Sequence, residues 1–232
     1  MSKNDQVGSN VGKAHPEREV SLAAYAAVLI LVIAISVIID ALFFANGASL
    51  KREGGGLEMI SAVLYINGVI VFFKVVPSVR WLSLWQIPAL LVFFALRELD
   101  FDKAFTSSGV LSSNLYRGDS ALTTKLIAGS VLVLFLVVVF RIIRKGAPAV
   151  FRSVRNRETW GVLAIGAVAV TVATKQLDGL GRKLGEIGIE VSQGVDFAAS
   201  MLEEVGEAFI PVLIILALLA CWKGRSNVGS QG

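Results

Sequence analysis

Carboxylate side chains recur at helical spacing within or beside the apolar stretches of this 232-residue chain. Glu98 and Asp102 are four residues apart. Glu203 and Glu207 have the same spacing, and Glu204 lies three residues before Glu207. Residues three or four apart share one face of a helix. Because a charge inside a membrane helix is costly unless it is paired or hydrated, such residues usually face the protein interior and carry function. The spacing therefore indicates an acidic site between helices.

Several carboxylates in one polar pocket would support either cation binding or acid–base chemistry. Crowded negative charges share protons or hold a cation, and ligand sets made only of oxygen suit Mg²⁺, Mn²⁺ or Ca²⁺. Two carboxylates in different environments also serve as general acid and general base. The hypothetical metal ligands are Glu58, Glu98, Asp102, Glu203, Glu204 and Glu207. The candidate catalytic residues among them are Glu98, Asp102 and Glu207, and the bases expected to pair with the acids are Arg97, Lys125 and Lys175.

A purely structural interpretation covers some of these acids. An acidic side chain at a helix N-terminus is stabilised by the helix dipole, which accounts for Glu58, Glu203 and Glu204 without any chemistry. Glu98 and Glu207 are each expected about one turn inside a helix, so a functional role is the favoured interpretation for those two.

Other residue types exclude several classes of site. His15 is the only histidine and Cys221 the only cysteine, so one chain cannot build a three-histidine zinc site, a Ser-His-Asp triad or a disulfide. The sequence also lacks a Walker loop, a Gly-x-Gly-x-x-Gly fingerprint and a Gly-x-Ser-x-Gly elbow.

The elements that must position the acids are long apolar blocks. Hydrophobic residues make up 55% of the chain and charged residues 17%, whereas soluble domains carry about 25% charged residues. Blocks of about 18 or more apolar residues are long enough to cross a bilayer. We predict an all-α polytopic membrane protein with one domain, 20–222, between a disordered tail, 1–19, and a C-terminal tail, 223–232. The six expected membrane helices are approximately 20–45, 57–76, 81–101, 122–143, 159–177 and 201–222.

Two of these helices have special features. The apolar run that ends at Trp222 begins only at Ala208, too short for a bilayer core of about 30 Å at about 1.5 Å per residue. The last helix should therefore start near Met201 and include the three glutamates. Pro88 is expected to bend the third helix. Between the last two helices, apolar residues at helical spacing over roughly 178–200 predict an amphipathic helix on the outer surface, loosened by four glycines.

The distribution of basic residues predicts the orientation. If the N-terminus is cytoplasmic, the inner segments hold 13 of the 22 basic residues and only four of the 18 acids. All four tryptophans then lie at the inner interface, where indole rings are favoured. We predict that both termini are cytoplasmic. The basic residues follow the inner loops, so nucleic-acid binding has no support; the segment Arg141–Arg157 could instead bind anionic lipid, and self-association of the chain is left open.

The chain also resembles a family of uncharacterised bacterial inner-membrane proteins. The family is similar to it in an acid that begins the second helix (Glu58), an Arg-Glu-x-Asp motif that ends the third (Arg97–Asp100) and a Glu-Glu-x-x-Glu motif that opens the last (Glu203–Glu207). The resemblance extends over most of residues 20–222. It implies a location in the bacterial inner membrane and marks residues, but it implies no activity.

Three classes of function are compatible with an acidic pocket open to the outer face. A divalent-cation-dependent enzyme that modifies lipids or the cell envelope needs only a one-sided pocket. An ion- or proton-coupled transporter needs polar residues that continue toward the cytoplasm, and few are present. A non-catalytic membrane partner or sensor would use the acids in a structural ion-pair network. We regard the first class as the leading hypothesis from the sequence.

Overall fold

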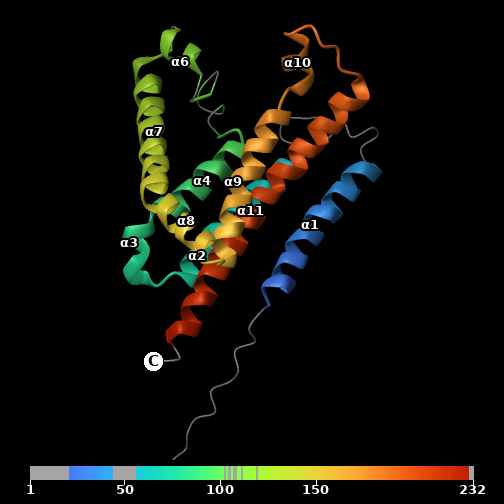
Figure 1. Cartoon of the computed structure of the whole chain (residues 1–232). Coiled ribbons are helices and arrows are strands. Elements are labelled where there is room, and N and C mark those ends of the chain that lie inside the picture. Colours follow the sequence, from blue (N-terminus) through green and yellow to red (C-terminus); the bar gives the residue numbers. More distant parts are fainter. Residues whose placement is uncertain are drawn as a thin grey trace, which may run out of the picture.

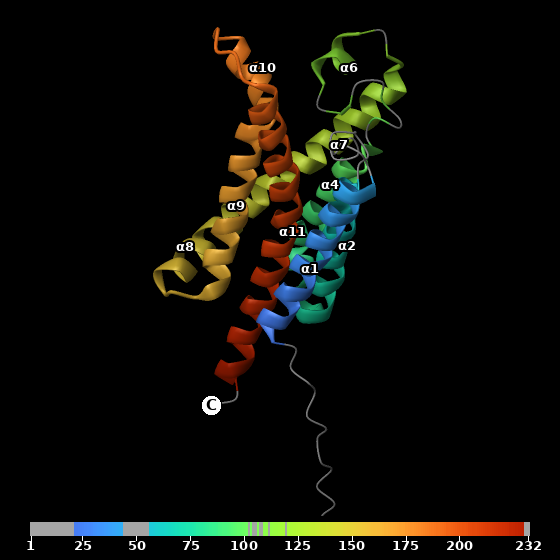
Figure 2. The same cartoon turned by 90° about the vertical axis from the view of Figure 1, so that its right-hand side faces the viewer.

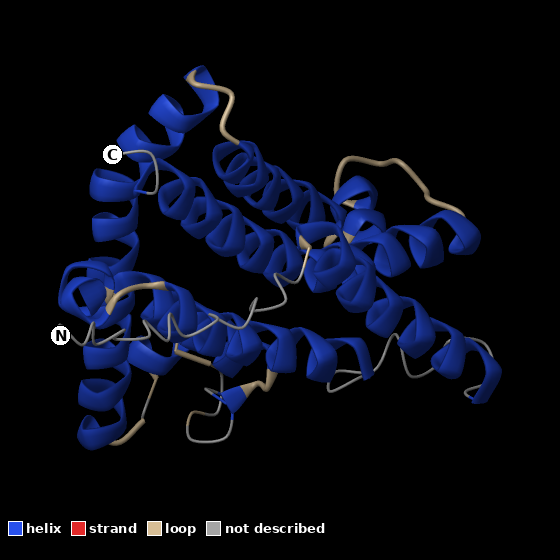
Figure 3. Ribbon diagram, turned by 90° about the horizontal axis from the view of Figure 1, so that it is seen from below, coloured by secondary structure: helices blue, strands red, loops and turns tan. Residues whose placement is uncertain are grey.

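The structure, a computed structural model, describes residues 21–43, 56–101, 103, 106, 109–110, 112–118 and 120–229, without the side chains of 39–43 and 223–229. Helices and the loops between them make up this part of the chain (Figure 3), which confirms the all-α prediction. The expected N-terminal tail, 1–19, lies outside the described residues.

The described helices are those of an integral membrane protein. Four are long and apolar enough to cross a bilayer, namely α2 (Gly56–Val75), the continuous helical stretch Leu122–Arg155, α9 (Thr159–Leu177), and α11 as far as Trp222 (Gln193–Trp222). A fifth crossing is added if the bent pair Ser78–Leu84 and Gln86–Glu98 counts as one span. The first helix, α1 (Leu22–Phe43), has described side chains only to Ile38 and falls short of the required length over that part. Among the described residues, the structure thus supports four or five of the six predicted crossings.

Large apolar side chains point outward from these helices. On α7 (Leu122–Arg141), Leu126, Val133 and Phe140 are about 60% exposed. Such a surface would be unfavourable in water, whereas in a bilayer it contacts lipid tails of equal polarity. The exposed apolar faces therefore agree with the membrane assignment.

Helix α11 (Gln193–Gly229) is the central element of the bundle. It packs against α9 and α2, with α1 along another side (Figures 1 and 2). On α2, buried residues recur every seventh position at Leu57, Leu64 and Val71, and they meet Val212 and Ile215 of α11. Because lipid tails are as apolar as these side chains, close packing rather than escape from water holds the helices together. The helix continues to Gly229, so most of the segment expected as a C-terminal tail is helical.

The predicted third helix, 81–101, is not one straight helix. After a short 3-10 turn, η2 (Ser78–Arg80), the chain forms α3 (Trp81–Leu84) and α4 (Gln86–Glu98), with a bend of 64° between the two sides of Trp85. Pro88 explains the break, since its nitrogen carries no hydrogen to donate to the carbonyl of Leu84 and its ring crowds that turn. The expected bend is present, but it separates the predicted helix into two helices, α3 and α4, instead of curving one continuous helix.

The basic connection after the fourth predicted helix is also helical. The π-helical turn η3 (Ile142–Gly146) joins α7 to α8 (Ala147–Arg155), which packs beside α9 (Figure 2). At this corner Gly161 of α9 lies against Ser153 of α8, with no room for a Cβ atom. The small residue therefore allows α8 to fold back onto α9.

The prediction of one long amphipathic helix over roughly 178–200 is wrong in its extent. The structure has a short helix, α10 (Leu180–Gly185), followed by a turn, and α11 already begins at Gln193. Gly179 and Gly188 have φ values of +61° and +81°, a left-handed conformation that glycine adopts without steric cost. These two glycines end helical stretches, which is the reason that the apolar periodicity did not produce one continuous helix.

Candidate functional site

The candidate site begins at the C-terminal end of α4. Leu91, Ala95 and Glu98 are buried at positions four and three residues apart, so they form one inward face of the helix. The helix ends immediately afterwards, where Asp100 takes a positive φ of 46°, which Asp tolerates better than most residues. Glu98 therefore extends the buried face of α4 to its last turn.

The second buried carboxylate is Glu207, in the middle of α11. Glu207 is 8% exposed, and so is Glu98. Both acids are therefore buried, although each was expected only about one turn from the end of its helix. Glu207 is 15 residues before Trp222, or about 22 Å along the helix. The two residues that the sequence singled out as lying inside the bundle do lie there.

Ion pairs connect these acids across three helices. Arg97 Nη2 donates to Glu207 Oε1 at 3.0 Å, and Arg97 Nη1 lies 3.7 Å from Glu98 Oε1. From α9, Lys175 Nζ lies 3.7 Å from the same Glu207 oxygen and 3.2 Å from Asp178 Oδ2. We call these five residues, Glu98, Arg97, Glu207, Lys175 and Asp178, the ion-pair network. It joins α4, α11 and α9 in one continuous chain of opposite charges.

Exposure divides the network into an inner and an outer part. The side chains of Glu98 and Glu207 are 4% and 11% exposed, whereas those of Arg97 and Lys175 are 51% and 47% exposed. The two bases therefore lie at the rim and cover the two acids below them. Long basic side chains place their charge at a polar surface in this way while their stems remain on apolar surface.

Glycine allows α9 and α11 to approach closely beside this network. A Cβ atom at Gly206 would lie 2.5 Å from Thr174 Cγ2. Thr174 is 3% exposed and directly precedes Lys175. The absence of a side chain at Gly206 thus sets the distance at which Lys175 meets Glu207.

The sequence reasoning missed Tyr65, which belongs to the same region. Tyr65 lies on α2, is 3% exposed, and interacts electrostatically with Arg97, Glu98 and Glu207. Its ring packs against Phe94 of α4 at a centroid distance of 5.3 Å. One signal could have identified it, because Tyr65 is seven residues after Glu58 and therefore on the same helical face.

The other predicted acids surround the network to different degrees. Glu58, at the start of α2, is partly buried and interacts electrostatically with Glu98 and Glu204. Glu203 and Glu204 are partly buried on α11, in electrostatic range of Glu207. The structure therefore brings these three near the two buried acids.

One predicted residue, Lys125, is not brought to this place. Lys125 is on α7, where its ammonium group donates to the carbonyl of Gly118 at 2.8 Å. Asp102 lies outside the described residues. Its neighbours Asp100 and Lys103 form an exposed pair at 2.9 Å.

No protein-family model, curated protein or solved structure matches the chain. The resemblance to a family of inner-membrane proteins therefore stays a prediction. What the structure supports is the coarser statement that several long apolar helices form a polytopic membrane protein.

The arrangement of the acids in the described residues gives no support to the predicted metal site. Within the part of the chain that the structure describes, no three His, Cys, Asp or Glu side chains form a group that could hold a metal ion. In addition, Arg97 and Lys175 both lie against the carboxylate of Glu207. The predicted metal and catalytic roles stay predictions, since Asp102 is outside the described residues.

Proposed function

We propose that this chain is a non-catalytic partner or sensor in the membrane, with a structural ion-pair network that ties α4, α9 and α11 together. The observation that carries this proposal is the position of Glu207, whose carboxylate accepts from Arg97 at 3.0 Å and faces Lys175 at 3.7 Å. A carboxylate already engaged by two bases is a poor metal ligand and a poor proton carrier. The network therefore favours this class over the enzyme and the transporter.

A second candidate is supported by the excess of acids around the network. Glu58, Glu203 and Glu204 add three carboxylates to a set that already has one more acid than bases. A net negative pocket attracts a divalent cation or a cationic head group. The cation-dependent enzyme acting on lipids or the envelope, with Mg²⁺, Mn²⁺ or Ca²⁺, is therefore kept as the alternative.

Metal titration separates the two candidates. For the full chain in detergent, we expect the electron paramagnetic resonance signal of Mn²⁺ to remain that of the free ion, and Mg²⁺, Mn²⁺ or Ca²⁺ to leave the free energy of unfolding unchanged. A true site would stabilise the fold by about 2.7 kcal/mol at a metal concentration one hundredfold above Kd.

The variants Glu98→Gln and Glu207→Gln make this experiment specific, with the exposed Glu186→Gln as the control. Mn²⁺ binding that is lost in the two variants and kept in the control would contradict the structural proposal and support the enzyme. Absence of binding, together with lower stability in Glu207→Gln, is the result that we expect.

For the topology, we propose six crossings in the bacterial inner membrane, with both termini in the cytoplasm and the ion-pair network toward the outer face. The excess of basic residues in the inner segments supports this orientation. The sixth crossing is α1, whose 22 residues contain one charge, Asp40. On this topology the segment Arg141–Arg157 lies at the inner surface, where we propose that it contacts anionic lipid.

Cysteine labelling tests the orientation. In a Cys221→Ser background, Ile187→Cys should react with a membrane-impermeant maleimide in intact bacteria, because Ile187 is 70% exposed beside α10. Asn156→Cys, exposed after α8, should react only once the cells are permeabilised. The reverse pattern would show that the N-terminus is outside.

A further inference from the structure

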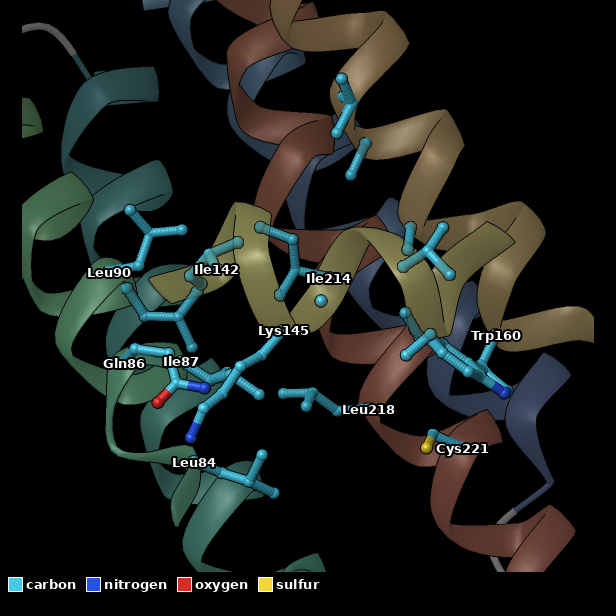
Figure 4. A pocket seen from close by; sticks show the side chains of 18 of the residues that line it. Leu84, Gln86, Ile87, Leu90, Ile142, Lys145, Trp160, Ile214, Leu218 and Cys221 are labelled. Carbon is cyan, nitrogen blue, oxygen red and sulfur yellow. The ribbon is translucent and has the colours of Figure 1, made fainter. Parts of the chain in front are cut away.

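A cavity of about 500 Å³ lies at the end of the bundle opposite to the ion-pair network. Figure 4 shows it between α4, α9 and α11, with η3 and α8 passing over it. Most of its wall is aliphatic or aromatic, with Ile87 and Leu90 from α4, Ala164 from α9, and Ile214 and Leu218 from α11. Its volume lies within the range of about 300–1,000 Å³ that is typical of ligand pockets. An apolar chain is the kind of ligand that this wall would accept.

Polar groups gather at one side of the cavity. Gln86 is 3% exposed, and within the described residues no hydrogen-bond donor reaches its Oε1 atom. Figure 4 shows the amide of Gln86 and the ammonium group of Lys145 on the same side of the cavity. A buried acceptor without a donor costs about 1–3 kcal/mol, so a ligand that donates to Gln86 would remove this cost.

Two more basic residues, Arg141 and Arg144, are close to Lys145 in the sequence but do not line the cavity. Arg141 stacks over the ring of Trp85, with the guanidinium carbon 5.4 Å from the ring centroid. Its buried Nε atom also has no acceptor in the described part of the chain. Arg144 and Lys145 follow in η3. The ammonium group of Lys145 and the unpaired acceptor of Gln86, on one side of an apolar cavity, match a head group that is anionic and also carries a hydroxyl.

We propose that this cavity binds one acyl chain of an anionic phospholipid with a hydroxyl-bearing head group, such as phosphatidylglycerol. Lys145 contacts the phosphate, the hydroxyl donates to Gln86 Oε1, and the acyl chain lies between α4, α9 and α11. The inference builds on the proposed lipid contact of Arg141–Arg157 and adds a defined site, in which one lipid binds through its chain as well as its charge.

Native mass spectrometry of the full chain tests this site. The protein is purified in mild detergent and mixed with equal amounts of phosphatidylglycerol and phosphatidylethanolamine. The mass of the complex then shows which lipid stays bound. We expect one phosphatidylglycerol to be retained. Lys145→Gln should reduce its occupancy about fivefold, the effect of one basic residue near a membrane surface. Ala164→Leu, which fills the cavity, should reduce it at least as much.

Two matched controls keep the test specific. Ala169→Leu adds the same side chain to an exposed position of α9, and Arg152→Gln removes one charge from an exposed position of α8 that does not line the cavity. Both should retain the lipid. Equal retention of the two lipids by the natural chain, or full retention by Ala164→Leu, would overturn the proposal. If Arg152→Gln loses the lipid as strongly as Lys145→Gln while Ala164→Leu keeps it, the surface contact of the basic segment stands and the cavity site does not.

Discussion

Replacing Arg97 with methionine is expected to lower the free energy of unfolding by about 3 kcal/mol. Breaking a buried ion pair by removing one partner costs about 3–5 kcal/mol, because the other charge stays in place without compensation. The loss should lie at the low end of that range for two reasons. The side chain of Arg97 is half exposed, and Lys175 still faces Glu207 at 3.7 Å. Methionine keeps the apolar stem of arginine, so the change measures the charge and not the packing.

The stability of Arg97→Met is measured by titrating the detergent-solubilised chain with sodium dodecyl sulfate and following tryptophan fluorescence. Lys103→Met is the matched control, since its pair with Asp100 is exposed on both sides and should contribute about 0–1 kcal/mol. The double variant Arg97→Met, Glu207→Gln should recover part of the loss, because the uncompensated charge is gone. Equal stability of Arg97→Met and Lys103→Met would show that the network does not hold the bundle.

The position of the two central acids could be predicted from the sequence. A carboxylate about one turn inside an expected membrane helix has to face the interior or water, and this argument selects Glu98 and Glu207, the two that are buried. The partners of those acids were harder to assign. Arg97 and Lys175 are at the same level of the bundle as the acids, but so was Lys125, and only the three-dimensional packing of α7 away from α9 and α11 separates it from them.

The bends of the chain and the cavity could not be predicted. Pro88 indicated a bend, but its size, 64°, depends on how α4 packs against α2. The cavity depends in turn on that bend and on the π-helical turn η3, which brings Lys145 toward Gln86. Neither residue stood out in the sequence, since a single glutamine near a helix start and a lysine in a basic segment are each ordinary. Gln86 and Lys145 come together at the cavity only because the fold brings together segments about sixty residues apart.

The contact between α9 and α11 depends on the missing side chain at Gly206. A Cβ atom there would be 2.5 Å from Thr174 Cγ2, closer than nonbonded carbon atoms can approach. Thr174 cannot turn its methyl group away easily, because its side chain is branched at Cβ and its hydroxyl donates to the carbonyl of Thr171 at 3.1 Å. Small residues at such crossings let helices in a membrane pack closely.

Gly206→Ala is therefore expected to destabilise the protein, although alanine favours helix. Overpacking costs about 1–3 kcal/mol, against about 1 kcal/mol gained in helix propensity, so a net loss of about 1–2 kcal/mol should appear in the same detergent titration. Gly166→Ala is the control on α9, because its Cβ would meet Leu213 at 3.9 Å, an ordinary contact; it should be neutral or stabilising. Thr174→Ser removes the obstructing methyl and keeps the hydroxyl, so the double variant Gly206→Ala, Thr174→Ser should be more stable than Gly206→Ala alone. If the serine gives no recovery, the contact between Gly206 and Thr174 does not determine how closely α9 and α11 pack beside the ion-pair network.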